Sequence, residues 1–195
     1  MTGLGWMFGK DLPLVSLTFA RGLTALQLLE RMGADAATVA VRDQDDFHDE
    51  FASRLFETDA YVVSAGRWGD WAWAWEHASW RCVEDTRLIT DVSQGTAAVA
   101  LHFSEGPATF WYAEDGQLLT AYSTEASPGL EDFIGGAPSR FDSELRKHGA
   151  DPETNEYGPL SARALFLRLA EGLGAGLAQD DLDTAPVLSA QLTAR

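Results

Sequence analysis

The sequence has one cysteine, Cys82, and few basic residues. A single cysteine excludes a disulfide within the chain, and such a chain usually belongs to a reducing compartment. Lysine and arginine number 14 against 30 aspartates and glutamates, so the formal net charge is −16. A protein this acidic repels a phosphate backbone, and we expect no direct nucleic-acid binding. A basic protein or a cationic ligand would be attracted, although the charge could also serve solubility alone.

Long apolar runs are also absent from the sequence. No stretch approaches the roughly 20 apolar residues that cross a bilayer. Residues 1–10 have neither the basic start nor the continuous apolar segment of a secretory signal. We therefore predict a cytoplasmic protein that does not insert into a membrane.

Motifs for cofactors, metals and nucleophiles are missing as well. The acids and the histidine within 45–50 lack the HExxH or DxDxDG spacing of a metal site, and the aspartates within 180–183 are no better placed. The glycines of 172–176 come after a predicted helix, whereas a phosphate-binding loop needs its glycines at the N-terminus of a helix. Cys82 has no CxxC partner, and no GxSxG elbow occurs. We expect no cofactor and no metal, and we interpret both acidic runs as solvated surface.

The first half of the chain predicts strands and helices in turn. Apolar alternation indicates a strand over 14–20. Thr24 followed by Gln27 forms a capping box that starts a helix, and Gly33 is placed to end it. Apolar residues four apart then predict a helix over 42–57.

From residue 60 onwards a period of two dominates. It predicts two strands joined by a turn at Gly69-Asp70, a short helix near 88–92, and three further strands. The predicted strands are 61–68, 71–76, 97–103, 109–113 and 117–122, the last two joined by an Asp-Gly turn. The segments that follow are a loop over 123–138, a helix over 139–149, a polar loop to 157 and a helix from Pro159 to Gly174. The tail 179–195 has one possible short helix and is expected to fray.

These patterns predict one α+β domain over 1–195. Its core would be an antiparallel meander of about five strands, flanked by N-terminal and C-terminal helices. The composition, with 46% hydrophobic and 23% charged residues, is that of an ordinary globular protein.

Several segments together resemble a family of small uncharacterised actinobacterial proteins, a domain of unknown function. The resemblance is carried by LTFARGLT at 17–24, LLERMG at 28–33, GDWAWAWE at 69–76, VALHF at 99–103, FWYAEDG at 110–116 and the last apolar helix. It implies a coherent fold and an actinobacterial source. It implies no catalytic residue, cofactor or substrate.

The strand over 71–76 is the most informative segment. Side chains alternate across a strand, so Trp71, Trp73 and Trp75 share one face and Ala72, Ala74 and Glu76 share the other. The predicted strand over 97–103 repeats this separation, with His102 on its alanine side. The tryptophans are either core or an exposed platform for a sugar, a cationic ligand or a partner helix, which Trp80 and Trp111 could extend.

The alanine face also has two interpretations. Small residues let a helix pack closely. Alternatively, they form the floor of a shallow pocket into which Glu76 and His102 project. These two residues either act as an acid–base pair or are hydrogen-bonded to each other for stability alone.

Two functional hypotheses follow. The first is a non-enzymatic interaction protein, immunity-like or regulatory, that engages a partner through its acidic surface or its tryptophan-bearing sheet. The second is a cofactor-independent enzyme or small-molecule binder. Its pocket would be lined by Trp71, Trp73, Trp75, Trp111 and Tyr112, with Glu76, His102 or Arg21 as polar groups. A nucleic-acid mimic built on surface carboxylates is a third idea.

Overall fold

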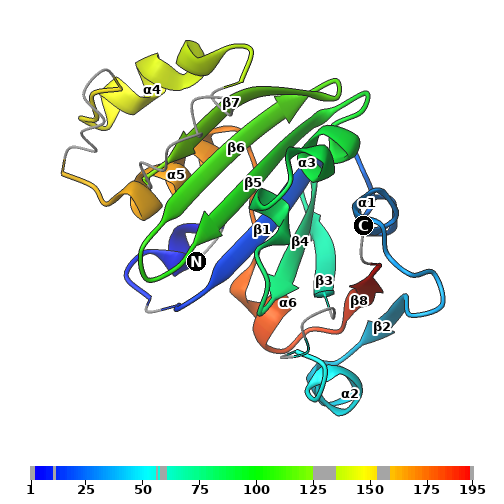
Figure 1. Ribbon diagram of the computed structural model, residues 1–195. Helices are drawn as coiled ribbons and strands as arrows, with labels where there is room; N and C mark the ends of the chain where they lie inside the picture. Colours follow the sequence, from blue (N-terminus) through cyan, green and yellow to red (C-terminus); the bar gives the residue numbers. More distant parts are fainter. Residues whose placement is uncertain are drawn as a thin grey trace.

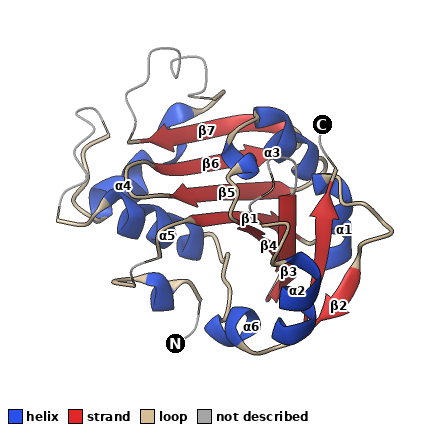
Figure 2. Cartoon of the chain, turned by 60° about the horizontal axis from the view of Figure 1, so that its bottom comes forward, coloured by secondary structure: helices blue, strands red, loops and turns tan. Residues whose placement is uncertain are grey.

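The computed structural model describes residues 3–10, 12–55, 57, 61–124, 135–152 and 159–193. Its strands are β1 Val15–Arg21, β2 Ala40–Arg42, β3 Tyr61–Trp68, β4 Trp71–His77, β5 Ala97–Phe103, β6 Ala108–Glu114, β7 Gln117–Ser123 and β8 Val187–Leu192. They form one antiparallel sheet of eight strands in the order β2-β8-β3-β4-β1-β5-β6-β7. The sheet is strongly twisted, so β5, β6 and β7 cross the direction of β3 and β8 steeply (Figure 2).

Helices pack on both faces of this sheet (Figure 1). They are η1 Gly5–Met7, α1 Ala25–Met32, α2 Gln44–Phe51, η2 Arg81–Val83, α3 Thr86–Val92, η4 Pro138–Phe141, α4 Asp142–Lys147, α5 Ala162–Gly172 and α6 Gln179–Asp183. One apolar cluster joins η1, α4 and α5 to the tryptophan side of the sheet. A second joins α1, α3 and Cys82 of η2 to the alanine side.

The predicted separation of indoles and alanines is confirmed. Residues 71–76 are extended within β4, and their neighbours on β1 repeat the pattern: Phe19 lies opposite Trp73, and Ala20 opposite Ala72. Both faces are buried, because Trp73 and Ala74 each have no exposed surface. The sheet is therefore a middle layer between two helical layers.

Local signals in the sequence were reliable. Thr24 and Gln27 form the expected capping box, and Gly33 ends α1 with a φ of 87°. The β3–β4 hairpin turns at Gly69-Asp70, and the β6–β7 hairpin turns at Asp115-Gly116, where both residues have positive φ.

The strand count and the meander need correction. The sheet has eight strands, not about five. β1 lies between β4 and β5, so β3–β4 and β5–β6–β7 are two separate hairpin units. β8 arises from the tail that was expected to fray: residues 187–192 pair with both β2 and β3. These pairings join segments more than a hundred residues apart, and such contacts leave no local pattern in the sequence.

Several boundaries also differ from the predicted ones. The helix expected over 42–57 spans only Gln44–Phe51, because Arg42 belongs to β2 and the Asp43 carboxylate caps the helix by accepting from Asp46 N–H. Pro159 precedes α5 instead of lying in its first turn, and Ser161 is the cap. Of the two loops predicted at 123–138 and 150–157, residues 125–134 and 153–157 lie outside the described part of the chain.

Candidate functional site

The tryptophan face of β4 is core. Trp71 is 4% exposed and Trp73 is fully buried, and both belong to the cluster beneath η1 and α5. Gly66 on β3 lets the Trp73 ring lie across the sheet, because a Cβ there would stand 2.4 Å from Trp73 Cζ2. Trp75 is partly buried against the same cluster. These rings are therefore not an open platform for a ligand.

The other residues of the predicted pocket do not join them. Trp111 and Tyr112 are adjacent on β6 and pack into opposite apolar clusters, Trp111 beneath α3 and Tyr112 on the tryptophan side. Tyr112 donates to Glu114 through its hydroxyl and lies under the Arg140 guanidinium. Arg21 is exposed at the end of β1. The set proposed from sequence is therefore spread over both faces of the sheet.

Glu76 and His102 share the alanine face and belong to one polar cluster. β1 lies between their strands, and its Ser16 is paired with His102 in the sheet register. Ser16 Oγ is 3.0 Å from His102 Nδ1 and donates to Ser79 O at 2.6 Å. Ser79 Oγ donates in turn to Glu76 Oε2 at 2.5 Å. The two predicted residues are thus joined through two serines that sequence reasoning missed.

The direction of these hydrogen bonds limits the chemistry. Ser16 has one hydroxyl proton, and the Ser79 carbonyl oxygen can only accept, so that proton points at Ser79. Ser16 Oγ must then accept at His102, which requires a proton on His102 Nδ1. In this arrangement His102 Nδ1 is a donor to Ser16 and not its general base.

Burial favours the protonated forms of the neighbouring acid and thiol. Desolvation raises the pKa of Glu76, against hydrogen bonds from Ser79, the Arg81 backbone and Cys82 that lower it. Desolvation and the nearby Glu76 charge raise the pKa of Cys82 well above its usual value. A nucleophilic cysteine needs the opposite shift. Cys82 Sγ instead donates to Leu101 O at 3.8 Å.

Residues 78–83, which we call the strap, close over this cluster. Ala78 leaves β4 with a φ of 54°, a left-handed conformation that is uncommon for a residue other than glycine. Arg81 donates to Thr193 O at 2.8 Å and stacks over the Tyr61 ring. Trp80 is 51% exposed on the outer side of the strap.

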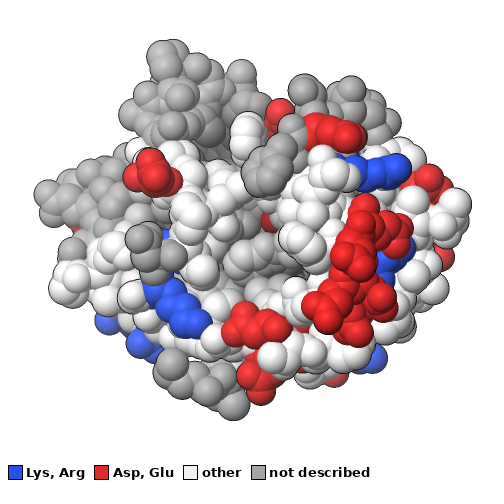
Figure 3. Space-filling view, turned by 90° about the horizontal axis from the view of Figure 1, so that it is seen from below, with Lys and Arg blue, Asp and Glu red and all other residues white. Residues whose placement is uncertain are grey.

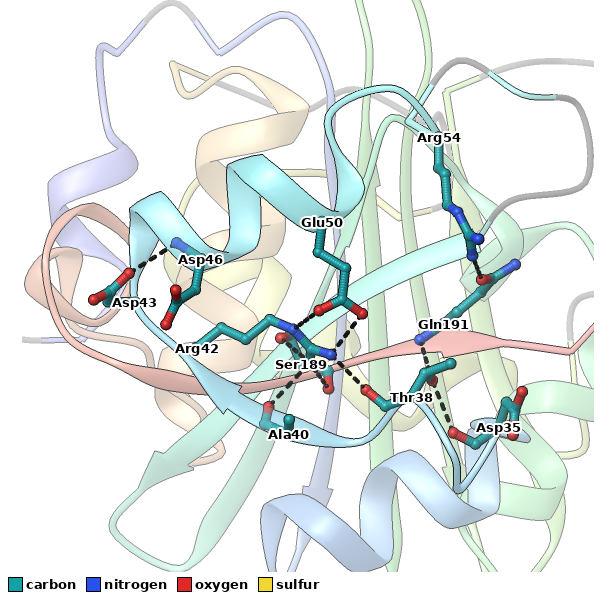
Figure 4. A network of polar contacts seen from close by, with 10 residues as sticks. All are labelled: Asp35, Thr38, Ala40, Arg42, Asp43, Asp46, Glu50, Arg54, Ser189 and Gln191. Carbon is teal, nitrogen blue, oxygen red and sulfur yellow. Dashed lines mark hydrogen bonds and ion pairs between the residues drawn. The ribbon is translucent and has the colours of Figure 1, made fainter.

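Arg42 is the centre of a second polar network that the sequence did not reveal (Figure 4). Its Nε and Nη2 donate to the two carboxylate oxygens of Glu50, at 2.7 and 2.8 Å. Nη1 donates to the carbonyl and hydroxyl oxygens of Ser189, and the guanidinium stacks on the Phe51 ring. Arg42 is only 7% exposed. Its hydrogen bonds to Glu50 and Ser189, which we call the Arg42 fork, therefore hold α2 on β2 and β8.

A small cavity lies beneath α2. It is lined by Arg42, Asp43, Gln44, Phe47, Ser64, His77, Leu182 and Val187, and its volume of about 10 Å³ suits one water molecule. His77 Nε2 is 2.8 Å from Ser64 Oγ, and its ring contacts that of Phe47. Burial lowers the pKa of His77 to about 4.

Carboxylates gather on one side of the molecule, over α2 and α6 (Figure 3). Five belong to α2 and its cap, and three belong to α6. They are Asp43, Asp45, Asp46, Asp49 and Glu50, with Asp180, Asp181 and Asp183. Gln44 Nε2 donates to Leu182 O at 2.6 Å and ties the two helices together. We call this surface the acidic face.

Family comparison gives one match. A model described as "Family of unknown function (DUF6461)" matches residues 14–185. The chain belongs to this family. That match covers every strand of the sheet except β8, and it contains Ser16, Glu76, His102 and the α2 carboxylates. The match says nothing of the organism, so the actinobacterial source stays a prediction.

No curated protein and no solved structure matches the chain. Among the described residues, no group of three or more His, Cys, Asp or Glu side chains is placed to hold a metal ion. None of the described helices is long and apolar enough to cross a membrane.

Proposed function

We propose that this protein is a non-enzymatic interaction protein, immunity-like or regulatory, which binds a basic partner through the acidic face. The observation that carries the proposal is the gathering of carboxylates on two helices fixed to each other and to the sheet. A surface of this kind steers a cationic partner and suits patches of Lys or Arg. The tryptophan-bearing sheet, the other surface considered from sequence, is covered by helices.

The acidic face is built to keep its shape. The Arg42 fork holds Glu50 and stacks on Phe51, and Gln44 ties α2 to α6. A rigid array loses little conformational entropy when it binds. Hydrogen bonding to Arg42 also lowers the pKa of Glu50, which keeps that carboxylate charged.

The test compares two variants of equal charge. The face variant replaces four aspartates of the acidic face by asparagine: Asp45, Asp46, Asp49 and Asp180. The control variant removes four carboxylates elsewhere: Glu30→Gln, Asp70→Asn, Glu84→Gln and Glu105→Gln. All eight residues are exposed, and each variant carries a formal charge of −12 after losing four carboxylates from −16. Each protein is used to capture partners from its host at low and at high salt.

We expect a basic host protein to bind the wild type and the control variant at low salt. It should be lost from the face variant and released by high salt, because salt screens charges across a contact. Equal capture by both variants, or no basic partner for the wild type, contradicts the proposal.

The rival function, a cofactor-independent enzyme or small-molecule binder, has one supporting observation: the Ser16, Glu76 and His102 cluster. This cluster is closed beneath the strap, and Trp71 and Trp73 are packed core. A metabolite library screened by thermal shift tests it. A shift that disappears in His102→Ala would favour this rival, and unchanged melting across the library counts against it.

A further inference from the structure

Glu76 is a buried acid with an incomplete set of hydrogen bonds. Its side chain lies at the end of β4 and is 1% exposed. Oε2 accepts from Ser79 Oγ at 2.5 Å and from Arg81 N–H at 2.9 Å. Oε1 is buried and has no hydrogen bond of ordinary geometry, although the thiol and amide of Cys82 lie near enough to this carboxyl to lower its pKa. Native proteins seldom leave a buried carboxylate oxygen in this state, because an ion without full solvation is costly.

Both donors to Glu76 come from the strap. Ser79 and Arg81 lie on either side of the exposed Trp80, and Ala78 begins the strap in a left-handed conformation. The Glu76 carboxyl therefore fastens this segment from within the sheet at two points, beside the bonds that Ser79 O, Arg81 and Cys82 make with Ser16, Thr193 and Leu101. Beneath the strap lie Ser16, fully buried, and His102, 7% exposed.

Three titratable or charged groups surround this carboxyl. β5 supplies His102, which connects to Glu76 through Ser16 and Ser79. η2 supplies Cys82 and Arg81, and the Arg81 guanidinium donates to Thr193 O. Burial is the largest influence on the pKa of Glu76 and raises it.

We propose that Glu76 is a proton-dependent latch: as a neutral acid it holds the strap closed over Ser16 and His102, and loss of its proton releases the strap. The proton belongs on Oε1, since Oε2 already accepts two hydrogen bonds. When the strap opens, water reaches the carboxylate and removes the cost of burying its charge.

Linkage gives the direction of the pH effect. The pKa of Glu76 is higher in the closed form than in water, so the closed form is fully favoured below the pKa of the open form. It is lost as the pH rises through the pKa of the closed form. One proton is released, so the opening equilibrium increases by at most about tenfold per pH unit between these two values.

Cys82 is a built-in reporter of opening. It is fully buried, it is the one cysteine of the sequence, and it lies in the strap. The experiment measures its rate of reaction with 5,5′-dithiobis(2-nitrobenzoate) in the wild type and in Glu76→Gln. The glutamine has the same shape, can accept from Ser79 and Arg81 through its amide oxygen, and does not titrate. The thiol reacts from the open strap, away from Glu76, so its own ionisation is the same in both proteins and cancels in the ratio of the two rates.

We expect the ratio of the wild-type rate to the Glu76→Gln rate to rise with pH, by up to about tenfold per unit, and then to level off. A ratio that stays constant from about pH 5 to about pH 9, a range that spans the usual values of carboxyl and thiol groups, overturns the latch.

A second measurement needs no variant at position 76. The ¹³C resonance of the Glu76 carboxyl is followed through a titration of the wild type, together with hydrogen exchange of the strap amides corrected for intrinsic rates. The latch predicts a carboxyl midpoint above the usual 4.5 and faster strap exchange with the same midpoint. A midpoint at or below that value, or strap exchange without an inflection, overturns it.

Discussion

The two faces of the sheet are buried by opposite means. On one side, large rings fill the space beneath η1 and α5, and a glycine at position 66 makes room for the Trp73 ring. On the other side, the small side chains of Ala72, Ala74, Ala98 and Ala100 leave room for α1 and α3 to pack close to the strands. The same strand alternation therefore produces a thick aromatic layer and a thin alanine layer.

The comparison shows where polar groups can be held. The alanine side ends at Glu76 and His102, where the strap with its short helix η2 covers the sheet in place of α1 and α3. The aromatic side ends at His77, which Phe47 of α2 covers. Both ends keep a titratable group under a short segment, whereas the centre of each face is apolar. The acidic face, which we propose as the recognition surface, lies outside both layers, on α2 and α6.

The largest effect should come from removing an indole of the aromatic layer. Trp73→Ala deletes a fully buried side chain and should cost about 3–5 kcal/mol of unfolding free energy, because transfer and cavity terms add. Trp80→Ala is the matched control; it is 51% exposed and should change stability by about 0.5 kcal/mol or less. Urea unfolding measures both. Similar costs for the two tryptophans would contradict the assignment of Trp73 to the core.

Acid should weaken the His77 end of the aromatic layer. The pKa of His77 is lowered from 6.5 to about 4 in the folded protein. The neutral, buried ring therefore contributes fully to the free energy of unfolding above pH 6.5, and this contribution is lost as the pH falls towards 4. The loss can reach about 3 kcal/mol for a shift of this size.

The experiment compares unfolding free energies of the wild type and His77→Gln across this pH range. The wild type should lose more stability than the variant between pH 6.5 and 4. Parallel pH profiles for the two proteins would mean that His77 has the same pKa in the folded and unfolded states. That result would contradict the lowering of its pKa by burial.

The alanine layer should reject larger side chains. Ala74→Leu places three extra carbons beneath α1 and should cost about 1–3 kcal/mol through overpacking. Ala36→Leu at an exposed turn position serves as the control and should be near neutral. Equal tolerance at both positions, measured by thermal unfolding, would mean that the alanine face leaves room for a pocket.

The smallest predicted effect concerns the N-terminus of α1. Thr24→Ala removes the capping hydroxyl that accepts from Gln27 N–H and should cost about 1 kcal/mol. Thr24→Asn keeps an acceptor and should restore most of that loss. Chemical denaturation of the three proteins tests the order, and an asparagine variant no better than alanine would contradict it.

Sequence reasoning succeeded where the signal was local. The capping box of α1, the turns at Gly69-Asp70 and Asp115-Gly116, and the alternation in β4 each depend on residues a few positions apart. It failed for β8, whose partners β2 and β3 lie far away in the chain, and for β1, which inserts between β4 and β5. Period-two patterns identify strands, but the order of strands in a sheet is a long-range property.

The candidate site shows the same limit. Glu76 and His102 were placed correctly on one face, because alternation alone decides that. Ser79 is three residues from Glu76, but Ser16, which completes the connection, is 63 residues from Ser79 and 86 residues from His102. Arg42 looked like the start of a helix, yet it is the buried anchor of that helix. Whether the tryptophans were core or surface depended on α5, which no local pattern could position.

The central claim is that recognition lies on the acidic face and not on the indoles. It is tested most directly by titrating ¹⁵N-labelled protein with a lysine-rich peptide at low salt and following every backbone and indole N–H signal. The account predicts shifts confined to the amides of α2 and α6, lost when salt is added, with the Trp71 and Trp73 indole signals unmoved. Shifts centred on those indoles, or spread evenly over all exposed acids, would contradict it.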